Sequence, residues 1–176
     1  MNVIIELSSG KQITIKNFRY PYLKFLPKGI NYSDVIMLRF EKSYEIFPIS
    51  QSLLEQLNNL QYLIIVGGSL KFIPNYISCA KSLLELTVIG TKIRSLPPTL
   101  VDMVNLLKLD VSHNSNLRHL NPVFPNIGLV NLTNCPHLTN AIMKVIEDFQ
   151  CKNIQNCMLS RDLYCLVCAT LQKVGT

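Results

Sequence analysis

Four of the six cysteines gather near the end of the chain in the spacing C-x5-C-x7-C-x2-C: Cys151, Cys157, Cys165 and Cys168. Four thiolates bind zinc tetrahedrally, and C-x2-C is a usual half-site. Only one such pair is present. It lies among leucines at a spacing typical of a buried helix, where cysteine packs as a small hydrophobe. We therefore expect buried free thiols and no cofactor, with zinc and a redox or disulfide role as alternatives.

The three histidines, His113, His119 and His137, are the other candidates for chemistry. No serine or cysteine nucleophile is predicted beside any of them, so a catalytic triad is unsupported. The sequence contains no P-loop, no G-x-G-x-x-G and no H-E-x-x-H motif. Gly67-Gly68 lacks the lysine and helix of a phosphate-binding loop, which makes it a turn. We expect solvated or hydrogen-bonded histidines and a protein that is not an enzyme.

Positive charge is concentrated at the start of the chain. The net charge is +6, and residues 1–30 contain five basic residues against Glu6 alone. Basic residues between Phe18, Tyr20, Tyr22 and Phe25 could follow a phosphate backbone with stacked bases. No recognised nucleic-acid motif accompanies them. We therefore favour aromatic core residues with solvated basic neighbours, and nucleic acid as a partner is the weaker alternative.

The elements that must position these residues belong to one hydrophobic chain. Its 176 residues, 48% apolar and 16% charged, fit one domain with a continuous core. The opening MNVIIELSSG carries no positive region of a signal peptide, and no apolar run approaches the length of a bilayer span. We expect an intracellular protein, cytoplasmic or nuclear, with reduced cysteines.

Apolar residues recur with a period of 23 residues. Leu60, Leu63 and Ile65 are followed by Leu83, Leu86 and Val88, and then by Leu106, Leu109 and Val111. A fourth unit, with Ile127, Val130 and Leu132, begins 21 residues later. The alternation Leu63-x-Ile65 predicts a short strand with one buried face. Such a unit cannot bury that face alone, so neighbouring units must stack into a parallel sheet over a continuous core.

The pattern resembles the leucine-rich-repeat family over about residues 35–140. Its consensus L-x-x-L-x-L-x-x-N/C-x-L is matched most fully by 106–114 and 127–135. In that family the Asn or Cys side chain satisfies backbone groups in the turn after the strand, the role expected of Asn114 and Cys135. Gly68 and Thr91 depart from it, so backbone flexibility or a hydroxyl must close those turns. The resemblance implies an α/β leucine-rich-repeat solenoid with parallel strands on a concave face.

The two ends of the chain are predicted to cover the repeats. Two β-branched runs at 2–7 and 12–16, separated by Ser8-Ser9-Gly10-Lys11, predict a β-hairpin that closes the first repeat. Apolar residues at helical spacing in 139–149 predict a C-terminal helix. The expected organisation is an N-terminal hairpin cap and linker at 1–34, repeats at 35–138 and a helical, cysteine-bearing cap at 139–176.

The repeat frame also predicts a functional surface, because residues between the strand leucines point to the concave face. Ile64, Val66 and Ile89 should form an exposed aliphatic patch beside Tyr62, and such clusters mark interaction sites. The complete set predicted to bind a partner is Tyr62, Ile64, Val66, Glu85, Thr87, Ile89, Lys108, Asp110, Ser112, Leu129 and Asn131.

The expected function is an intracellular protein–protein interaction module that binds its partner on this face. An alternative is a substrate-recognition subunit of a cullin-type ubiquitin ligase, which would also bind a ligase adaptor. The chain resembles those leucine-rich-repeat subunits in its cysteine-containing C-terminal segment, where the matching residues are Asp162-Leu163-Tyr164-Cys165-Leu166-Val167-Cys168.

Overall fold

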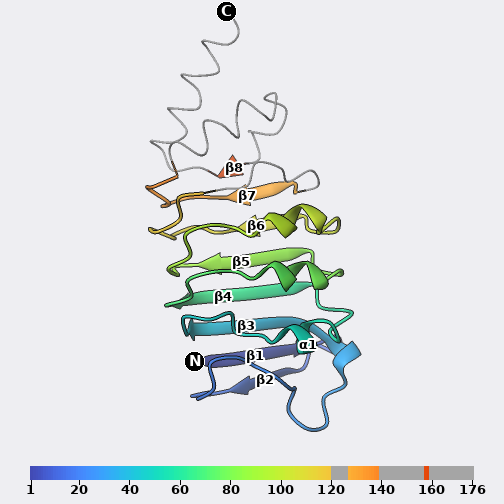
Figure 1. The fold of residues 1–176 in the computed structure, drawn as a ribbon. Helices are drawn as coiled ribbons and strands as arrows, with labels where there is room; N and C mark the ends of the chain where they lie inside the picture. Colours follow the sequence, from blue (N-terminus) through green and yellow to red (C-terminus); the bar gives the residue numbers. More distant parts are fainter. Residues whose placement is uncertain (120–126, 139–156, 159–176) are drawn as a thin grey trace, which may run out of the picture.

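The fold is a stack of strands that form one sheet (Figure 1). The structure is a computed structural model, and it describes residues 1–119, 127–138 and 157–158. The sheet order is β2-β1-β3-β4-β5-β6-β7-β8. The strands are β1 (Asn2–Leu7), β2 (Gln12–Ile15), β3 (Val35–Ser43), β4 (Tyr62–Gly68), β5 (Glu85–Ile89), β6 (Lys108–Asp110), β7 (Leu129–Asn131) and β8 (Cys157–Met158).

From β3 onward the sheet is parallel, and its register follows the repeat. Leu38 lies beside Leu63, Leu63 beside Leu86, and Leu86 beside Leu109. Val130 continues this row in β7. The parallel array predicted from the 23-residue period is therefore present, and it includes the earlier unit that begins at Val35.

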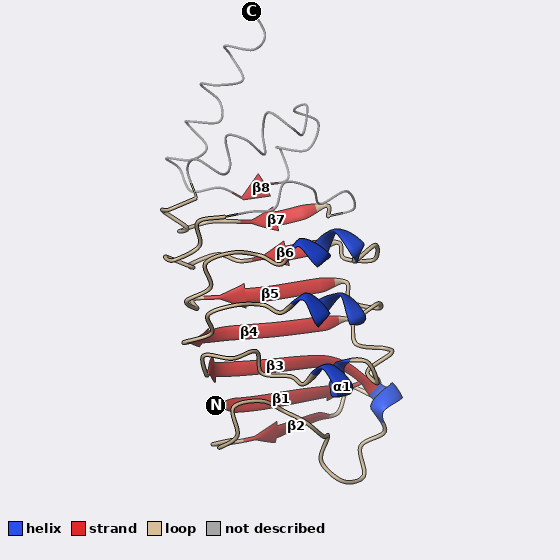
Figure 2. Ribbon diagram, in the orientation of Figure 1, coloured by secondary structure: helices blue, strands red, loops and turns tan. Residues whose placement is uncertain are grey.

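Short helices lie in the segments that return the chain from one strand to the next (Figure 2). They are α1 (Gln51–Leu54) and 3₁₀ helices at Asn75–Cys79 and Pro98–Asp102; a further 3₁₀ helix, Tyr32–Asp34, precedes β3. Ser50 caps α1 by accepting a hydrogen bond from the backbone N–H of Leu53. Pro74 and Pro97 precede the next two helices. Because these turns are short, the packing of their apolar residues, more than helix propensity, must hold them in place.

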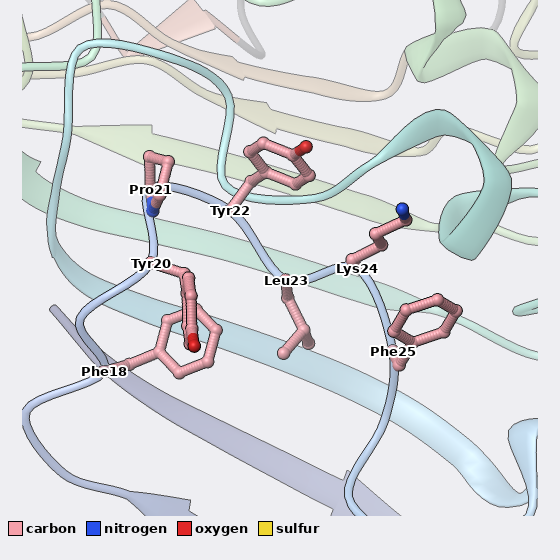
Figure 3. Close-up of a pocket in the computed structure, with 7 residues that line it drawn as sticks. All are labelled: Phe18, Tyr20, Pro21, Tyr22, Leu23, Lys24 and Phe25. Atoms are coloured by element: carbon pink, nitrogen blue, oxygen red, sulfur yellow. The ribbon is translucent and has the colours of Figure 1, made fainter.

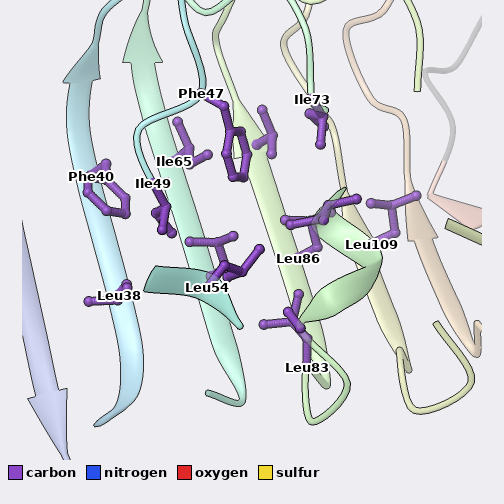
Figure 4. Packing of buried hydrophobic residues seen from close by; sticks show 14 of the residues in the cluster. Leu38, Phe40, Phe47, Ile49, Leu54, Ile65, Ile73, Leu83, Leu86 and Leu109 are labelled. Atoms are coloured by element: carbon purple, nitrogen blue, oxygen red, sulfur yellow. The ribbon is translucent and has the colours of Figure 1, made fainter. Parts of the chain in front are cut away.

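The core fills the space between the strands and the return segments (Figure 4). Leu38, Leu63, Leu86 and Leu109 from the strands are fully buried. Phe47, Ile49 and Ile73 from the return segments close over them. The repeats therefore share one continuous core, as expected when each unit contacts its neighbours on both sides.

The same left-handed backbone conformation recurs near the end of the strand in each repeat. The residues at this position have positive φ angles of 57°, 68°, 64°, 58° and 58°, and they are Lys42, Gly67, Gly90, His113 and Asn134. Two of them are glycine, which adopts this conformation without a steric penalty. The recurring turn sends the chain from strand to return segment in the same direction each time.

The predicted N-terminal hairpin is present at the edge of the sheet. β1 pairs antiparallel with β2, and on its other side it pairs antiparallel with β3. Val3 and Ile5 are fully buried and join the main core. At the other end β8 pairs parallel with β7, an element that the sequence did not predict. The helix expected at 139–149 lies outside the described residues.

Candidate functional site

The face of the sheet turned away from the core carries three rows of side chains, which we call the open face. The first row consists of Met37, Tyr62, Glu85, Lys108 and Leu129, aligned by strand register. The second consists of Arg39, Ile64, Thr87, Asp110 and Asn131. The third is Glu41, Val66 and Ile89. The residues predicted to face a partner are thus brought together on adjacent strands.

The middle of the open face is apolar. Val66 is the register neighbour of Ile89, and Ile64 lies two residues before Val66 on the same strand. These three side chains are partly buried, which corrects the expectation that they are exposed, whereas Tyr62 is exposed. Neighbouring strands lie close enough for each aliphatic side chain to cover part of the next. The result is a continuous aliphatic surface with Tyr62 at its margin.

Polar groups surround this apolar centre and are already paired. Lys108 Nζ lies 3.0 Å from Glu85 Oε1, and the Thr87 hydroxyl donates to the same carboxylate at 2.9 Å. Asn131 Nδ2 donates to Asp110 Oδ2 at 2.9 Å. Because most of their partners lie on the next strand, these side chains are held in fixed positions and offer their remaining hydrogen-bonding capacity to a ligand.

Two of the predicted contact residues present little surface. Thr87 and Ser112 are only 6% and 3% exposed. Thr87 lies between Ile64 and Asp110 in its row, which explains its burial. Ser112 lies beyond the end of β6, where its backbone carbonyl accepts from Gly90 and its N–H donates to Asp110 Oδ1. Both residues support the surface rather than form it.

The turns after the strands are closed by one column of side chains. Asn114 is fully buried, and its Nδ2 donates to the carbonyl oxygens of Val88 at 2.6 Å and Val111 at 2.8 Å. One repeat later the Cys135 thiol donates to Val111 O, with Sγ and O 3.1 Å apart. Asn114 and Cys135 thus satisfy backbone groups of the turn, as the consensus requires. The strands before these turns pair in parallel and in matching register. In these features the repeats resemble leucine-rich repeats.

Comparisons with known proteins found similarity only among solved structures. No protein-family model and no curated protein matches the sequence. Among solved structures, the chain is similar to a leucine-rich-repeat protein of Leptospira interrogans, with 25% identity and a TM-score of 0.47 over 66% of this chain and 27% of that one. The chain therefore spans about a quarter of the length of that protein.

The two departures from the leucine-rich-repeat consensus are resolved as predicted. The Thr91 hydroxyl donates to Asn114 Oδ1 at 2.6 Å, so it links its own turn to the next. Gly68 has a φ angle of +102°, and a Cβ placed there would collide with the backbone of Ser43. Only glycine fits at this point, because both the backbone conformation and the approach of the neighbouring repeat exclude a side chain.

The residues considered for catalysis or metal binding do not form a site in the described part of the chain. No group of three or more His, Cys, Asp or Glu residues is placed to hold a metal there. His113 Nδ1 lies 3.3 Å from Asn134 Nδ2, which makes it a hydrogen-bonded turn residue. His119 pairs with Ser95, and both lie in return segments of the repeats. Cys151, Cys165 and Cys168 lie outside the described residues.

The N-terminal aromatic residues are placed differently from the prediction. Tyr20, Tyr22 and Phe25 are exposed, so the expectation that they are core residues is wrong for these three. Only Phe18 packs partly against the core. All four line a surface hollow of about 520 Å³ beside the repeats (Figure 3). Within residues 1–119, 127–138 and 157–158, no helix has the length and hydrophobicity to cross a bilayer.

Proposed function

We propose that this leucine-rich-repeat chain is a protein-interaction module that binds a partner protein through the open face of its sheet. The observation that supports the proposal most directly is the continuous surface made by Tyr62, Ile64, Val66 and Ile89 on adjacent strands. An aromatic residue beside a contiguous apolar patch is typical of the energetic centre of an interface.

The surrounding charges favour a protein partner over a highly charged polymer. Glu85 is paired with Lys108 and Arg39 with Glu41, at 3.0 Å and 3.2 Å. Asp110 is the one further charge in these rows, so the open face lacks a large surplus of one sign, and its polar groups form a rim around an apolar centre. Such an interface gains affinity chiefly from burial of apolar surface, while the rim sets orientation and specificity.

The proposal is tested by capture of partners from cell lysate with the natural chain and two triple variants. The open-face variant carries Tyr62→Ala, Ile64→Asp and Ile89→Asp. The matched control carries Leu107→Ala, Val101→Asp and Val104→Asp, which alter exposed apolar residues of the return segments. We expect the control to retain its partners. The open-face variant should lose them, with affinity for a purified partner reduced by about 2 kcal/mol or more.

The folding of both variants is checked by circular dichroism before the comparison. Partners retained equally by the open-face variant would contradict the proposal. Partners lost only from the control variant would place the site on the return segments instead. A purified partner also permits hydrogen exchange, and protection should then appear over β4 and β5.

The more specific function, a substrate-recognition subunit of a cullin-type ubiquitin ligase, depends on residues 162–168. These lie outside the described residues, and the comparisons give this alternative no support. It predicts that a ligase adaptor is captured through the C-terminal segment, even by the open-face variant. The variant Leu163→Asp, Leu166→Asp tests this alternative. Loss of the adaptor from this variant, while the partners of the open face are retained, would support it.

A further inference from the structure

The segment that carries the N-terminal aromatic residues is fixed to the return side of the first repeat. The Leu23 N–H donates to Pro48 O at 2.7 Å, and the Ser50 N–H donates to Leu23 O at 3.0 Å. Leu23 and Leu26 are only 2% and 8% exposed, so they anchor the segment in the core. The backbone between them is thus held in place, and the side chains that alternate with Leu23 must point outward.

Three aromatic side chains of this segment are exposed. Tyr20 is 71% exposed, Phe25 is 64% exposed and Tyr22 is 37% exposed, values well above what folding alone requires of aromatic residues. Figure 3 shows Phe18 and Tyr20 on one side of the hollow, Phe25 on the other and Leu23 between them. We call this the aromatic hollow.

The apolar surface continues beyond the aromatic hollow. A second depression of about 340 Å³ shares Tyr22 and is lined by Ile46, Phe47 and Phe72. Ile46 and Phe72 are themselves 38% and 51% exposed. The two depressions therefore make an elongated surface across the N-terminal segment and the first repeats, which suits an extended ligand with more than one apolar side chain.

The segment that forms the aromatic hollow carries charge of one sign. Arg19, Lys24 and Lys28 are exposed, and no acidic residue occurs between Glu6 and Asp34. None of the ion pairs found in the described part of the chain involves these three cations. A ligand with carboxylates would therefore meet positive charge that no ion pair neutralises, on a segment that also presents an apolar depression.

We propose that the aromatic hollow binds an acidic polypeptide segment that inserts one large apolar side chain. The volume of about 520 Å³ accommodates an aromatic or long aliphatic side chain together with part of its backbone. Flanking Asp or Glu residues pair with Arg19, Lys24 and Lys28. This surface is separate from the open face, because Leu23 aligns with Ile49 in the return segment and not with a strand.

The arrangement of the rings favours a peptide over nucleic acid. Base stacking needs free aromatic faces. The Lys24 ammonium lies over the Phe25 ring, 5.5 Å from its centre, and Phe18 and Tyr20 pack against each other with centroids 5.7 Å apart. A membrane surface is the other alternative for an exposed segment of aromatic and basic residues, and vesicles are included in the test for that reason.

The test selects binders from a display library of random short peptides on the full chain, then measures the affinity of a selected peptide by fluorescence anisotropy. We expect the selected peptides to combine one aromatic or long aliphatic residue with flanking Asp or Glu. The double variant Tyr20→Ser, Phe25→Ser should weaken binding at least about tenfold. The matched control Val104→Ser, Leu107→Ser, which changes exposed apolar residues elsewhere, should bind normally.

A second pair of variants tests the charges. Arg19→Gln with Lys24→Gln should weaken the same peptide and reduce the salt dependence of its affinity, whereas Lys81→Gln should do neither. Oligo-dT and vesicles containing phosphatidylserine serve as competing probes. The proposal is overturned if no peptide is selected, if selected peptides lack acidic residues, or if the aromatic double variant binds them unchanged. It is also overturned if Tyr20 and Phe25 are required for binding of oligo-dT or of the vesicles but not for binding of the peptides.

Discussion

Asn114 accepts two hydrogen bonds from Thr91, one from the backbone N–H at 2.8 Å and one from the hydroxyl at 2.6 Å. Both residues are buried, and they belong to the turns of adjacent repeats. Because the Asn114 amide also donates to Val88 O and Val111 O, one side chain satisfies backbone groups from two repeats. Hydrogen bonds between buried polar groups therefore hold these repeats together in addition to apolar packing.

Replacement of this amide should therefore destabilise the whole array. Asn114→Ala leaves the Thr91 N–H and the carbonyl oxygens of Val88 and Val111 buried without these partners. We expect the free energy of unfolding to fall by about 3 kcal/mol, as measured by urea denaturation. Asn105→Ala is the matched control, because its amide makes one exposed hydrogen bond to Lys81 O, and its loss should cost about 1 kcal/mol or less. Equal effects of the two variants would refute the role assigned to Asn114.

The two adjacent glycines at the end of β4 should respond differently to substitution. Gly68→Ala places a Cβ against the backbone of Ser43 in a conformation with φ of +102°, so we expect a loss of about 3 kcal/mol or more. Gly67→Ala meets nothing within 4 Å and adopts a left-handed conformation with φ of +68°, which should cost about 1 kcal/mol. Thermal unfolding monitored by circular dichroism compares them, and a larger effect at Gly67 would contradict the structure.

The N-terminal hairpin should unfold together with the repeats. Ile5→Ala removes a fully buried side chain from the shared core, with an expected cost of about 3 kcal/mol. Ile4→Ala, its neighbour on the opposite face of β1, should cost less than about 1 kcal/mol, because that side chain is only partly buried. Urea denaturation measures both values. An Ile5→Ala variant of unchanged stability would show that the hairpin folds independently.

Cys135 should be slow to react in the folded protein. Burial raises the pKa of its thiol; the hydrogen bond with Asn114 lowers it in part, and the nearby Asp110 carboxylate raises it further. The thiolate therefore forms at higher pH in the folded chain than in the unfolded chain, so stability decreases as pH rises past the unfolded pKa of about 8.5. Iodoacetamide at mildly alkaline pH should label partly buried Cys79 before Cys135, as read by peptide mass spectrometry. Preferential labelling of Cys135 in the folded chain would contradict its placement.

The repeats were predictable because burial recurs with a fixed period. Leu63, Leu86 and Leu109 occupy equivalent positions in sequence, and stacking them requires no information beyond that spacing. The hairpin was predictable because its β-branched runs flank a short turn. The open-face positions followed from strand alternation, although the burial of Thr87 depends on neighbouring side chains that a single strand cannot reveal.

The aromatic hollow was not predictable from composition. Phe18, Tyr20, Tyr22 and Phe25 have the residue types of a core, and their exposure follows from the docking of Leu23 beside Ile49. One signal was present, since Tyr22-Leu23-Lys24 has the alternation of an extended segment with one buried side chain. Strand β8 depends on a contact between distant parts of the chain, for which neither the period nor the spacing gave a sign.

The column of turn residues also has a mechanical consequence. Between Val88 and Cys135 the buried side chains of Thr91, Asn114 and Cys135 fasten each loop to the next, whereas Gly68 contributes no side chain at the equivalent place. The strand pairing compensates, because β4 and β5 pair over five positions, whereas β5 with β6 and β6 with β7 pair over three each. The fastened turns thus lie where the strands are shortest. In an optical trap with handles on β3 and β7, Asn114→Ala should therefore lower the force at which the later repeats rupture and leave the β4–β5 junction unchanged.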